Sequence, residues 1–334
     1  MTIPQRSAGA LSTPLGVMGI GCWAFGGGEY WGPQDAKDEE AVVGQALDLG
    51  INYFDTAEAY NEGRSEEALG RALKGRRQQA VIGTKVSPSN AAPEALRQHC
   101  EASLRRLQTE TIDIYMVHWP LPAHLVGEAF AALQALQSEG KIRSIGVSNF
   151  GVRQLQEALA AGVRIDVNQL CYNLFSRSIE VELLPLCERL GIGILAYSPL
   201  MQGLLSGRFR SADELPAVRT RTRHFRGDRA GSRHGEAGIE AEVFAALERI
   251  RALAAELQVP MAQLALAWIL SRPAVSSVIV GVRSASQLAE NAAAARLALE
   301  ARWVAQLDQI TQPLLDQLGA SPDYFQDRDH GRTV

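Results

Sequence analysis

Four ionisable side chains, Asp55, Tyr60, Lys85 and His118, each end or closely follow a short apolar run. An ammonium held beside a phenol stabilises the phenolate and lowers the phenol's pKa from its ordinary value of about 10. Such a phenol is a general acid, and a carboxylate is the natural partner for a buried lysine. The four residue types predict a site that donates a proton to a carbonyl oxygen, without a nucleophilic serine or cysteine.

Lys85 carries the most information of the four. The chain has four lysines among its 33 Lys and Arg residues, so arginine is the default cation. A lysine inside an apolar run indicates a compact ammonium whose pKa can shift, and the alternative is a side chain that extends to solvent from the strand end. Asp55 alone also suits a helix cap or turn, and His118 alone suits a core histidine. His118 in a site can donate a hydrogen bond or share the proton.

The apolar runs alternate with segments of helical period along the chain. Eight strand–helix units with continuously apolar strands predict an α/β fold, a (β/α)8 TIM barrel. No G-x-G-x-x-G opens a helix after the first strand, which argues against a Rossmann fold. Strands are predicted at 16–23, 51–55, 80–86, 112–118, 142–148, 165–170, 192–197 and 276–281. Helices are predicted near 35–49, 65–76, 93–107, 126–139, 151–161, 179–190, 261–271 and 285–294.

Three segments exceed a minimal barrel, and we expect all of 1–334 to form one barrel domain. Extra helices are predicted at about 239–257 and at the C-terminal 301–318. A long loop after the seventh strand has little periodicity, and a loop of that length in a compact domain is usually functional. Its part 208–233 carries eight arginines against three acids. It is either a solvated surface or a flap that closes over a polyphosphate ligand.

Composition excludes several classes of function. The net charge of −4 and the pI near 5.9 argue against a nucleic-acid or membrane partner. No apolar run approaches the roughly 18 residues of a membrane span, and no strand carries a metal-binding H-x-H pair. Four scattered cysteines without a C-x-x-C motif indicate free thiols in a reducing cytoplasm. We therefore predict a cytoplasmic protein without a metal, and make no prediction of its oligomeric state.

Reduction of a carbonyl also requires a hydride donor, and the remaining strand ends suit a nicotinamide. Asn149 and Gln169 offer amides that can match a carboxamide, and Tyr197 offers an aromatic face for stacking. The stretch 281–283 opens a helix, so its backbone N–H groups and the Arg283 guanidinium can bind a phosphate. These residues predict a nicotinamide dinucleotide as cofactor.

Several motifs in this order resemble the aldo-keto reductase superfamily, in its branch of bacterial enzymes and potassium-channel β subunits. They are GINYFDTAEAY with GRSEEALGRAL, VIGTKV, IDIYMVHWP, GVSNF, NQLCYN, AYSPLMQGLLSGRF and VIVGVRSASQLAEN, between about residues 16 and 291. The resemblance implies that Asp55, Tyr60, Lys85 and His118 are the catalytic residues, with Tyr60 as the acid. It also implies NADPH bound in an extended pose without a Rossmann fold.

The resemblance implies contacts for the whole cofactor. Ser148, Asn149 and Gln169 would hold the carboxamide, and Tyr197 would stack on the nicotinamide. Arg283 stands in for the cations that bind the 2′-phosphate in other branches, so NADPH is predicted and NADH is the alternative. The further contacts implied, from the nicotinamide to the adenosine, are Trp23, Ser198, Pro199, Leu200, Gln202, Gly203, Arg208, Gly281, Gln287, Glu290 and Asn291.

A substrate pocket is predicted between Trp23, Tyr30, Trp31 and Trp119, with Asn61 placing a polar group at its rim. Aromatic walls suit aldehydes, ketones or sugars. The predicted function is NADPH-dependent reduction of such a carbonyl to the alcohol. The alternative is an NADPH-binding regulatory subunit with little or no turnover. A barrel aldolase that forms a Schiff base on a lysine is a third interpretation, but it gives the predicted nicotinamide contacts no purpose.

Overall fold

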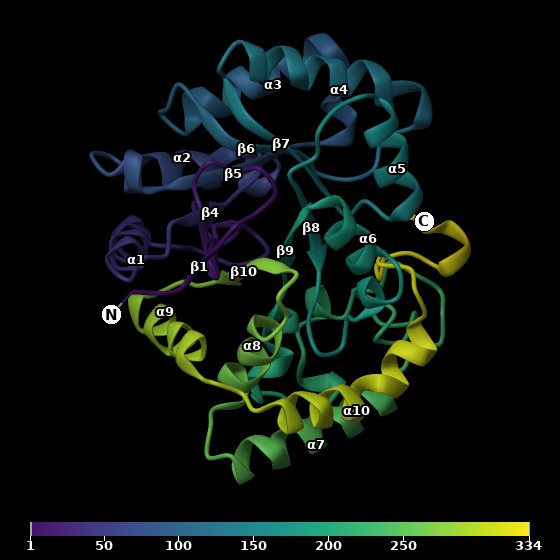
Figure 1. Cartoon of the computed structure of the whole chain (residues 1–334). Helices are drawn as coiled ribbons and strands as arrows, with labels where there is room; N and C mark the ends of the chain where they lie inside the picture. The colour runs from purple at the N-terminus through teal and green to yellow at the C-terminus, as the bar shows by residue number, and fades with distance from the viewer. Residues whose placement is uncertain (1, 334) are drawn as a thin grey trace.

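The computed structural model describes residues 2–333, and its centre is a closed barrel of eight parallel strands (Figure 1). The strand order around the barrel is β10-β3-β4-β5-β6-β7-β8-β9. The prediction of a TIM barrel with extra helices and a long loop after the seventh strand is confirmed. The strands are β3 (Met18–Gly21), β4 (Tyr53–Asp55), β5 (Val81–Val86), β6 (Ile112–Val117), β7 (Ile142–Ser148), β8 (Val167–Cys171), β9 (Gly193–Tyr197) and β10 (Val275–Gly281).

Helices surround the barrel and cover the outer face of its strands (Figure 1). The start of α1 is fixed by a side-chain cap. The Asp35 side chain accepts a hydrogen bond from the Lys37 backbone N–H at 2.8 Å. The predicted start of α6 is wrong by four residues, because Ser178–Glu180 forms a separate 3-10 turn. The helices are α1 (Ala36–Asp48), α2 (Arg64–Ala72), α3 (Pro93–Arg106), α4 (Ala123–Ser138), α5 (Val152–Ala160), α6 (Leu183–Leu190), α8 (Met261–Leu270) and α9 (Ala285–Ala292).

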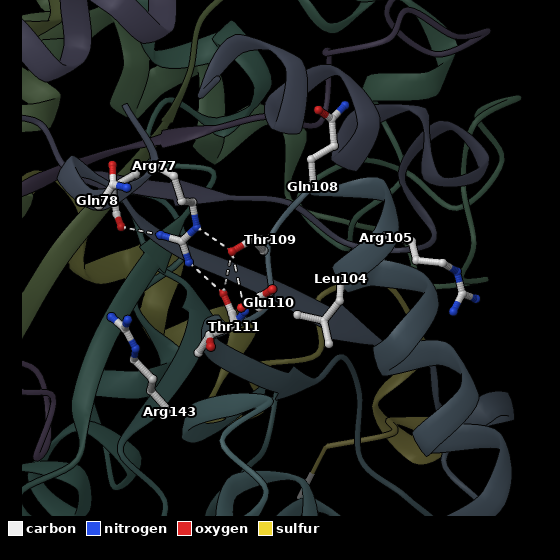
Figure 2. A pocket seen from close by; sticks show the side chains of 10 residues that line it. Arg77, Gln78, Leu104, Arg105, Gln108, Thr109, Glu110, Thr111 and Arg143 are labelled. Atoms are coloured by element: carbon white, nitrogen blue, oxygen red, sulfur yellow. Dashed lines mark hydrogen bonds between the residues drawn. The ribbon is translucent and has the colours of Figure 1, made fainter. Parts of the chain in front are cut away.

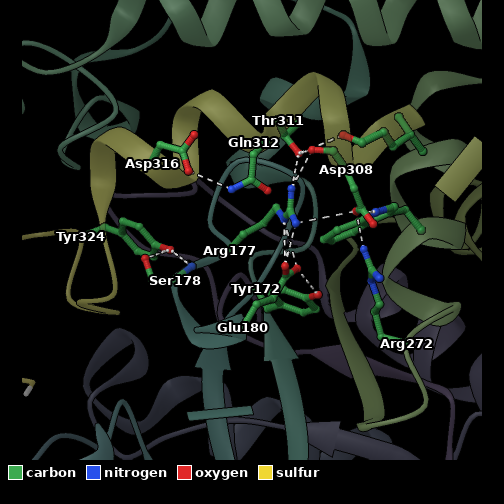
Figure 3. A network of polar contacts seen from close by, with 12 residues as sticks. Tyr172, Arg177, Ser178, Glu180, Arg272, Asp308, Thr311, Gln312, Asp316 and Tyr324 are labelled. Atoms are coloured by element: carbon green, nitrogen blue, oxygen red, sulfur yellow. Dashed lines mark hydrogen bonds and ion pairs between the residues drawn. The ribbon is translucent and has the colours of Figure 1, made fainter. Parts of the chain in front are cut away.

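Two further helices, α7 (Glu240–Glu256) and α10 (Ala301–Leu318), pack against each other outside the barrel (Figure 1). A polar network binds α10 to its neighbours (Figure 3). Asp308 accepts a hydrogen bond from the Trp268 indole N–H of α8 at 2.8 Å and pairs with Arg272. Arg177, after β8, donates to the Asp308 carbonyl at 2.9 Å. These contacts attach α10 to the barrel, although a minimal barrel of eight strand–helix units does not include this helix.

A small antiparallel hairpin, β1 (Gln5–Arg6) with β2 (Leu15–Gly16), precedes the first barrel strand. No element is predicted for residues 5, 6 and 15, and Gly16 falls at the start of the strand predicted at 16–23. The Arg6 guanidinium donates to the carbonyl oxygens of Leu270, Arg272 and Val275 at 2.6 to 3.0 Å. The hairpin is thereby attached to the chain that leads into β10, at the amino-terminal end of the barrel strands.

The barrel interior is filled with side chains, as is usual for this fold. The large ring of Tyr53 is fully buried there, among the side chains of Val81, Ile114 and Leu195. A Cβ at Gly83 would lie 2.5 Å from the Tyr53 hydroxyl oxygen, so the neighbouring strand needs glycine at this point. The phenol of Tyr53 therefore lies directly beneath the strand ends that carry the predicted site.

The segment between β9 and α7 contains three short 3-10 turns, at Met201–Ser206, Ala212–Glu214 and Ala217–Arg219, and no longer helix or strand. Within residues 2–333 no single helix is long and apolar enough to cross a membrane, and only α7 and α8 taken together, bent by 96°, pass such a test.

Candidate active site

The first relationship in the predicted site is the ion pair between Lys85 and Asp55. The Lys85 ammonium lies 2.9 Å from both carboxylate oxygens and donates to the Thr56 carbonyl at 2.7 Å. Lys85 is fully buried and Asp55 is 3% exposed, so the lysine does not extend to solvent. The two residues end up together because β4 and β5 pair in parallel, with Asp55 opposite Gly83. The ammonium lies 5.0 Å from the centre of the Tyr60 ring.

Tyr60 begins the turn that follows β4, and this turn has a strained backbone. Asn61 and Glu62 have φ angles of +50° and +59° in the left-handed region, which persists only where the surroundings enforce it. Here the Asn61 amide donates to the carbonyls of Trp23 and Phe25 at 2.9 and 2.8 Å. Asn61 thus ties the Tyr60 turn to the first βα loop, and its place at the pocket rim stays a prediction.

The expected direction of the Tyr60 pKa is wrong. Burial raises the pKa of the phenol above its ordinary value, and this effect outweighs the lowering by Lys85. Burial lowers the pKa of Lys85, but Asp55 and Tyr60 together raise it above its ordinary value. At neutral pH the pair is therefore an ammonium beside a protonated phenol, and a proton donor must hold its proton until the reaction requires it.

His118 follows β6, and its ring lies edge-on to Tyr60 with 5.8 Å between ring centres. Burial, with a smaller contribution from Lys85, lowers the pKa of His118 to about 3. The imidazole is therefore neutral near pH 7. The sequence allows two roles for His118, which are to donate a hydrogen bond or to share the proton. The first role fits the structure, because a neutral imidazole has no second proton to share.

Asp55 has two further donors. Gln169 donates from its amide nitrogen to Asp55 Oδ1 at 2.6 Å, and the Tyr53 hydroxyl donates to the same atom at 3.2 Å. Gln169 is thus turned toward the carboxylate in this structure. Tyr53 is absent from the sequence prediction, although its spacing of two from Asp55 places both side chains on the same face of β4.

The predicted nicotinamide contacts form one hydrogen-bonded group at the ends of β7, β8 and β9. Asn149 has a left-handed φ of +62°, and its amide oxygen accepts from the Tyr197 hydroxyl at 2.8 Å. Its amide nitrogen donates to Ser148 Oγ and to the His118 carbonyl, both at 3.1 Å. These bonds fix the Tyr197 ring beside the amide, an arrangement that suits an aromatic heterocycle with a carboxamide.

The stretch after β9 has an unusual backbone. Ser198, Met201 and Gln202 have φ between +46° and +53°, and Gly203 has +98°. Two backbone N–H groups of this stretch are bonded within it, that of Met201 to the Ser198 carbonyl and that of Gly203 to the Leu200 carbonyl, both at 2.9 Å. The Tyr30 hydroxyl donates to the Gln202 side-chain oxygen at 2.6 Å, so the first βα loop lies beside this stretch. This is the stretch in which the resemblance to the aldo-keto reductases predicts contacts to the cofactor's diphosphate.

The residues predicted for the adenosine end lie around the start of α9. The Arg283 side chain donates to Gln34 Oε1 at 2.8 Å and to the Pro33 carbonyl, and its N–H is bound by Gln287 Oε1 at 3.0 Å. This bridge joins the first and last βα loops. Arg208, Gly281, Arg283, Gln287 and Glu290 are exposed, whereas Asn291 is buried.

Three of the four predicted pocket residues form one aromatic cluster. The Trp23 ring lies 4.6 Å from Tyr30, 5.4 Å from Trp31 and 5.7 Å from Tyr60, measured between centres. Trp119 lies apart and contacts Phe325 of the C-terminal segment at 6.1 Å.

The C-terminal segment also reaches the nicotinamide contacts, because the Thr333 hydroxyl donates to the Asn149 carbonyl at 2.8 Å. Arg332, next to it, lies 3.5 Å from the centre of the Trp119 ring. Sequence reasoning gave this segment no role, since it has no periodic pattern.

A groove of about 730 Å³ lies at the other end of the barrel, where β5, β6 and β7 begin (Figure 2). Its Arg77 is already engaged, with Asp113 at 2.7 Å and Thr109 Oγ1 at 3.0 Å. It lacks the ionisable set of the carboxyl-terminal end and is a less suitable site. Among the described residues no group of His, Cys, Asp and Glu could hold a metal ion, and Cys22, Cys100, Cys171 and Cys187 are free and buried.

Comparison with known proteins places the chain among relatives of known family. Residues 17–312 match the Aldo/keto reductase family. The chain is 37% identical to the NADH-specific methylglyoxal reductase of Escherichia coli (strain K12), over 87% of this chain and 93% of that protein. It is 30% identical to a probable voltage-gated potassium channel subunit beta of Arabidopsis thaliana, over 86% and 89%.

Solved structures of aldo-keto reductases are also similar to this chain. An aldo-keto reductase from Klebsiella pneumoniae in complex with NADPH superposes with a TM-score of 0.72 at 31% identity, covering 92% of this chain and 95% of that one. The glycerol dehydrogenase of Gluconobacter oxydans gives 0.79 at 28% identity, covering 95% and 97%.

The family match, the relatives and the solved structures together define the class of the protein, an NAD(P)H-dependent oxidoreductase. The chain belongs to the aldo/keto reductase family, as its motifs indicated.

Proposed function

We propose that this protein reduces the carbonyl group of an aldehyde, ketone or sugar to the alcohol in the cytoplasm, with NADPH as the reductant and Tyr60 as the general acid. One observation carries the proposal above the others. A fully buried ammonium, Lys85, is bonded to both oxygens of Asp55 and lies 5.0 Å from the Tyr60 ring. An ion pair with only a structural role does not require a phenol beside it, whereas an ammonium that stabilises a phenolate must lie next to one.

NADPH would supply the hydride to the carbonyl carbon. The protein's own residues then manage the charge that develops on the oxygen. Tyr60 gives its proton to that oxygen, and the Lys85 ammonium stabilises the phenolate that remains. Asp55 keeps Lys85 charged, and neutral His118 donates a hydrogen bond without adding charge. The nicotinamide would be held by Ser148, Asn149 and Tyr197, because the hydrogen bonds among these three side chains fix their positions.

The choice of NADPH is supported by the Klebsiella pneumoniae structure with that cofactor and by the exposed Arg283 guanidinium, which suits a phosphate. The Escherichia coli relative is described as NADH-specific, so NADH is the alternative to test. Relatives described as methylglyoxal reductase and glycerol dehydrogenase support a small carbonyl compound or its alcohol as substrate.

The test combines cofactor binding with turnover. We expect a fluorescence titration to show tighter binding of NADPH than of NADH, and a panel of aldehydes and ketones to be reduced at saturating NADPH. Binding without turnover would support the regulatory alternative. Binding of neither nucleotide would contradict the proposal.

A matched pair of variants tests the acid. Tyr60→Phe should lower turnover by about 10²- to 10⁴-fold and leave cofactor affinity nearly unchanged. Tyr115→Phe is the control, since the Tyr115 hydroxyl is buried without a hydrogen-bond partner in the described structure. If Tyr60→Phe kept most of its rate while Tyr115→Phe behaved as wild type, Tyr60 would not be the acid.

A further inference from the structure

The arginines of the loop 208–233 fall into two groups. The first group forms ion pairs with nearby carboxylates, mainly at the surface: Arg210, Arg223, Arg226 and Arg229. The second group has no ion pair or hydrogen bond from its side chain among residues 2–333: Arg208, Arg219, Arg221 and Arg233. Three members of the second group, Arg219, Arg221 and Arg233, act electrostatically on Tyr30 at the mouth of the site. The unpaired positive charge of this loop is therefore concentrated at the substrate entrance.

Arg221 holds the central position in this group. Its guanidinium carbon lies 5.0 Å from the ring centre of Tyr30, 5.8 Å from that of Trp23 and 5.6 Å from that of Phe325. Trp23 in turn stacks on Tyr60, and Phe325 contacts Trp119. Arg221 is thus separated from the proposed acid by a single aromatic ring.

Among residues 2–333, no negative group compensates this cation. The groups that act on Arg221 are Tyr30, Arg233 and Tyr197, and burial lowers the pKa of its guanidinium. Its Nε is buried without a hydrogen-bond partner in the part of the chain that is described. The indole N–H of Trp31, in the same aromatic cluster, is likewise buried and unpartnered. Buried donors are nearly always satisfied in proteins, so two unsatisfied donors in one cluster indicate a missing acceptor.

We propose that Arg221 binds an anionic group of the substrate, a carboxylate or a phosphate carried at a distance from the reacting carbonyl. An arginine stacked on aromatic faces keeps the N–H edge of its plane free, and this edge matches a carboxylate or phosphate in two-point contact. The aromatic cluster fixes the plane in advance, so little conformational freedom is lost on binding. This inference rests on the proposed function and assigns its substrate class.

A phosphate of the cofactor is the other source of the same chemistry. A small cavity of about 30 Å³ is lined by Arg219 and Arg221 and also by Ser198 and Gln202, from the stretch proposed for the diphosphate. The two sources differ in position. Arg219 lies over Trp31, and its Nη1 is 3.6 Å from the Cβ position of Gly203, so it faces the cofactor stretch. Arg221 lies over Trp23 and Phe325, which favours the substrate.

The experiment compares 4-oxobutanoate, an aldehyde with a distant carboxylate, with its methyl ester, which is nearly isosteric and neutral. Both are assayed at saturating NADPH with wild type, Arg221→Gln, Arg221→Lys and Arg210→Gln. Arg210 is the control because it lies in the same loop but pairs with Glu248 of α7. NADPH affinity is measured for each variant by fluorescence, and thermal unfolding verifies that each is folded.

We expect wild type to prefer the carboxylate in kcat/KM, and Arg221→Gln to lose about tenfold to a hundredfold on it, mainly through KM. The ester should be unaffected, and Arg221→Lys should recover part of the loss. An equal loss on both substrates, or weaker NADPH binding with the carboxylate preference intact, would overturn the assignment to the substrate. If wild type reduced the ester but showed no preference for the carboxylate, the role of Arg221 would be overturned while the proposed function stands. If wild type reduced neither substrate, both the role of Arg221 and the proposed function would be overturned.

Discussion

Gln169 donates a hydrogen bond to Asp55 at 2.6 Å across the barrel, although 114 residues separate them in the chain. Their strands, β8 and β4, stand four places apart in a ring of eight, so they face each other. Asp55 is therefore bound by Lys85 from the neighbouring strand, by Tyr53 from its own strand and by Gln169 from the opposite side. The Asp55 carboxylate therefore fixes the positions of the side chains around the proposed acid.

We expect Gln169→Met to destabilise the protein by about 1.5–3 kcal/mol, because it removes a hydrogen bond to a charged group and keeps the side-chain volume. Turnover should fall, since Asp55 is less firmly held, and NADPH affinity should change little. Urea unfolding and a fluorescence titration measure the two effects. A large loss of NADPH affinity with unchanged stability would show instead that Gln169 serves mainly the carboxamide.

The Lys85–Asp55 pair should show strong coupling in a double-mutant cycle. Lys85→Met leaves a buried carboxylate without its cation, which costs about 3–5 kcal/mol of unfolding free energy. Adding Asp55→Asn removes the stranded charge, so the double variant should be more stable than the single Lys85 variant while remaining inactive. Simple additivity of the two single effects in urea unfolding would contradict the pairing.

The pH dependence of catalysis should contain no ionisation from His118 between pH 5 and 8. Burial and Lys85 lower the pKa of His118 to about 3, so the ring is neutral over that whole range. His118→Asn, which keeps a hydrogen-bond donor, should lower kcat/KM without changing the shape of the profile. A transition near pH 6.5 in wild type that disappears in this variant would show that the imidazolium takes part.

His224 should make the protein less stable in acid. Burial lowers its pKa to about 4, and its Nε2 lies 2.9 Å from the Phe175 carbonyl oxygen. The unfolded chain, with a histidine pKa near 6.5, binds the proton more readily, so the contribution of His224 is complete above pH 6.5 and is lost as the pH falls to about 4. The loss is up to about 3 kcal/mol.

The comparison for His224 is urea unfolding of wild type and His224→Gln at pH 7.5 and 4.5. We expect a smaller decrease of stability between these pH values in the variant, with the remaining slope due in part to His118. Identical slopes would exclude His224 from the acid response.

Sequence reasoning recovered the barrel and the meeting of Asp55, Tyr60, Lys85 and His118 because both depend on local regularities. A strand that is buried on both faces is continuously apolar, so an ionisable residue at its end is conspicuous. In a closed parallel barrel all such ends meet at one edge. Two observations, apolar runs and the residues that end them, therefore suffice for the centre of the site.

The rest depends on interactions that no local pattern records. The direction of the Tyr60 pKa is a balance between burial and the Lys85 charge, and only the folded structure shows that burial is the larger. Gln169 offers the same amide to a cofactor or to Asp55, and only the folded structure shows that it is bonded to Asp55. The contacts of Phe325 and Thr333 at the mouth join segments about 200 residues apart in the chain.

The order of the strands divides the proposed work between two halves of the gene product. Asp55, Tyr60, Lys85 and His118 all precede β7, whereas Ser148, Asn149, Tyr197 and Arg283 all lie on β7 or after it. The proposed proton chemistry is thus encoded in the first half of the barrel, and most of the proposed cofactor contacts in the second. An engineer who exchanges only the second half between relatives should be able to alter the preferred nucleotide and keep the acid, provided that the bond from β8 to Asp55 is retained.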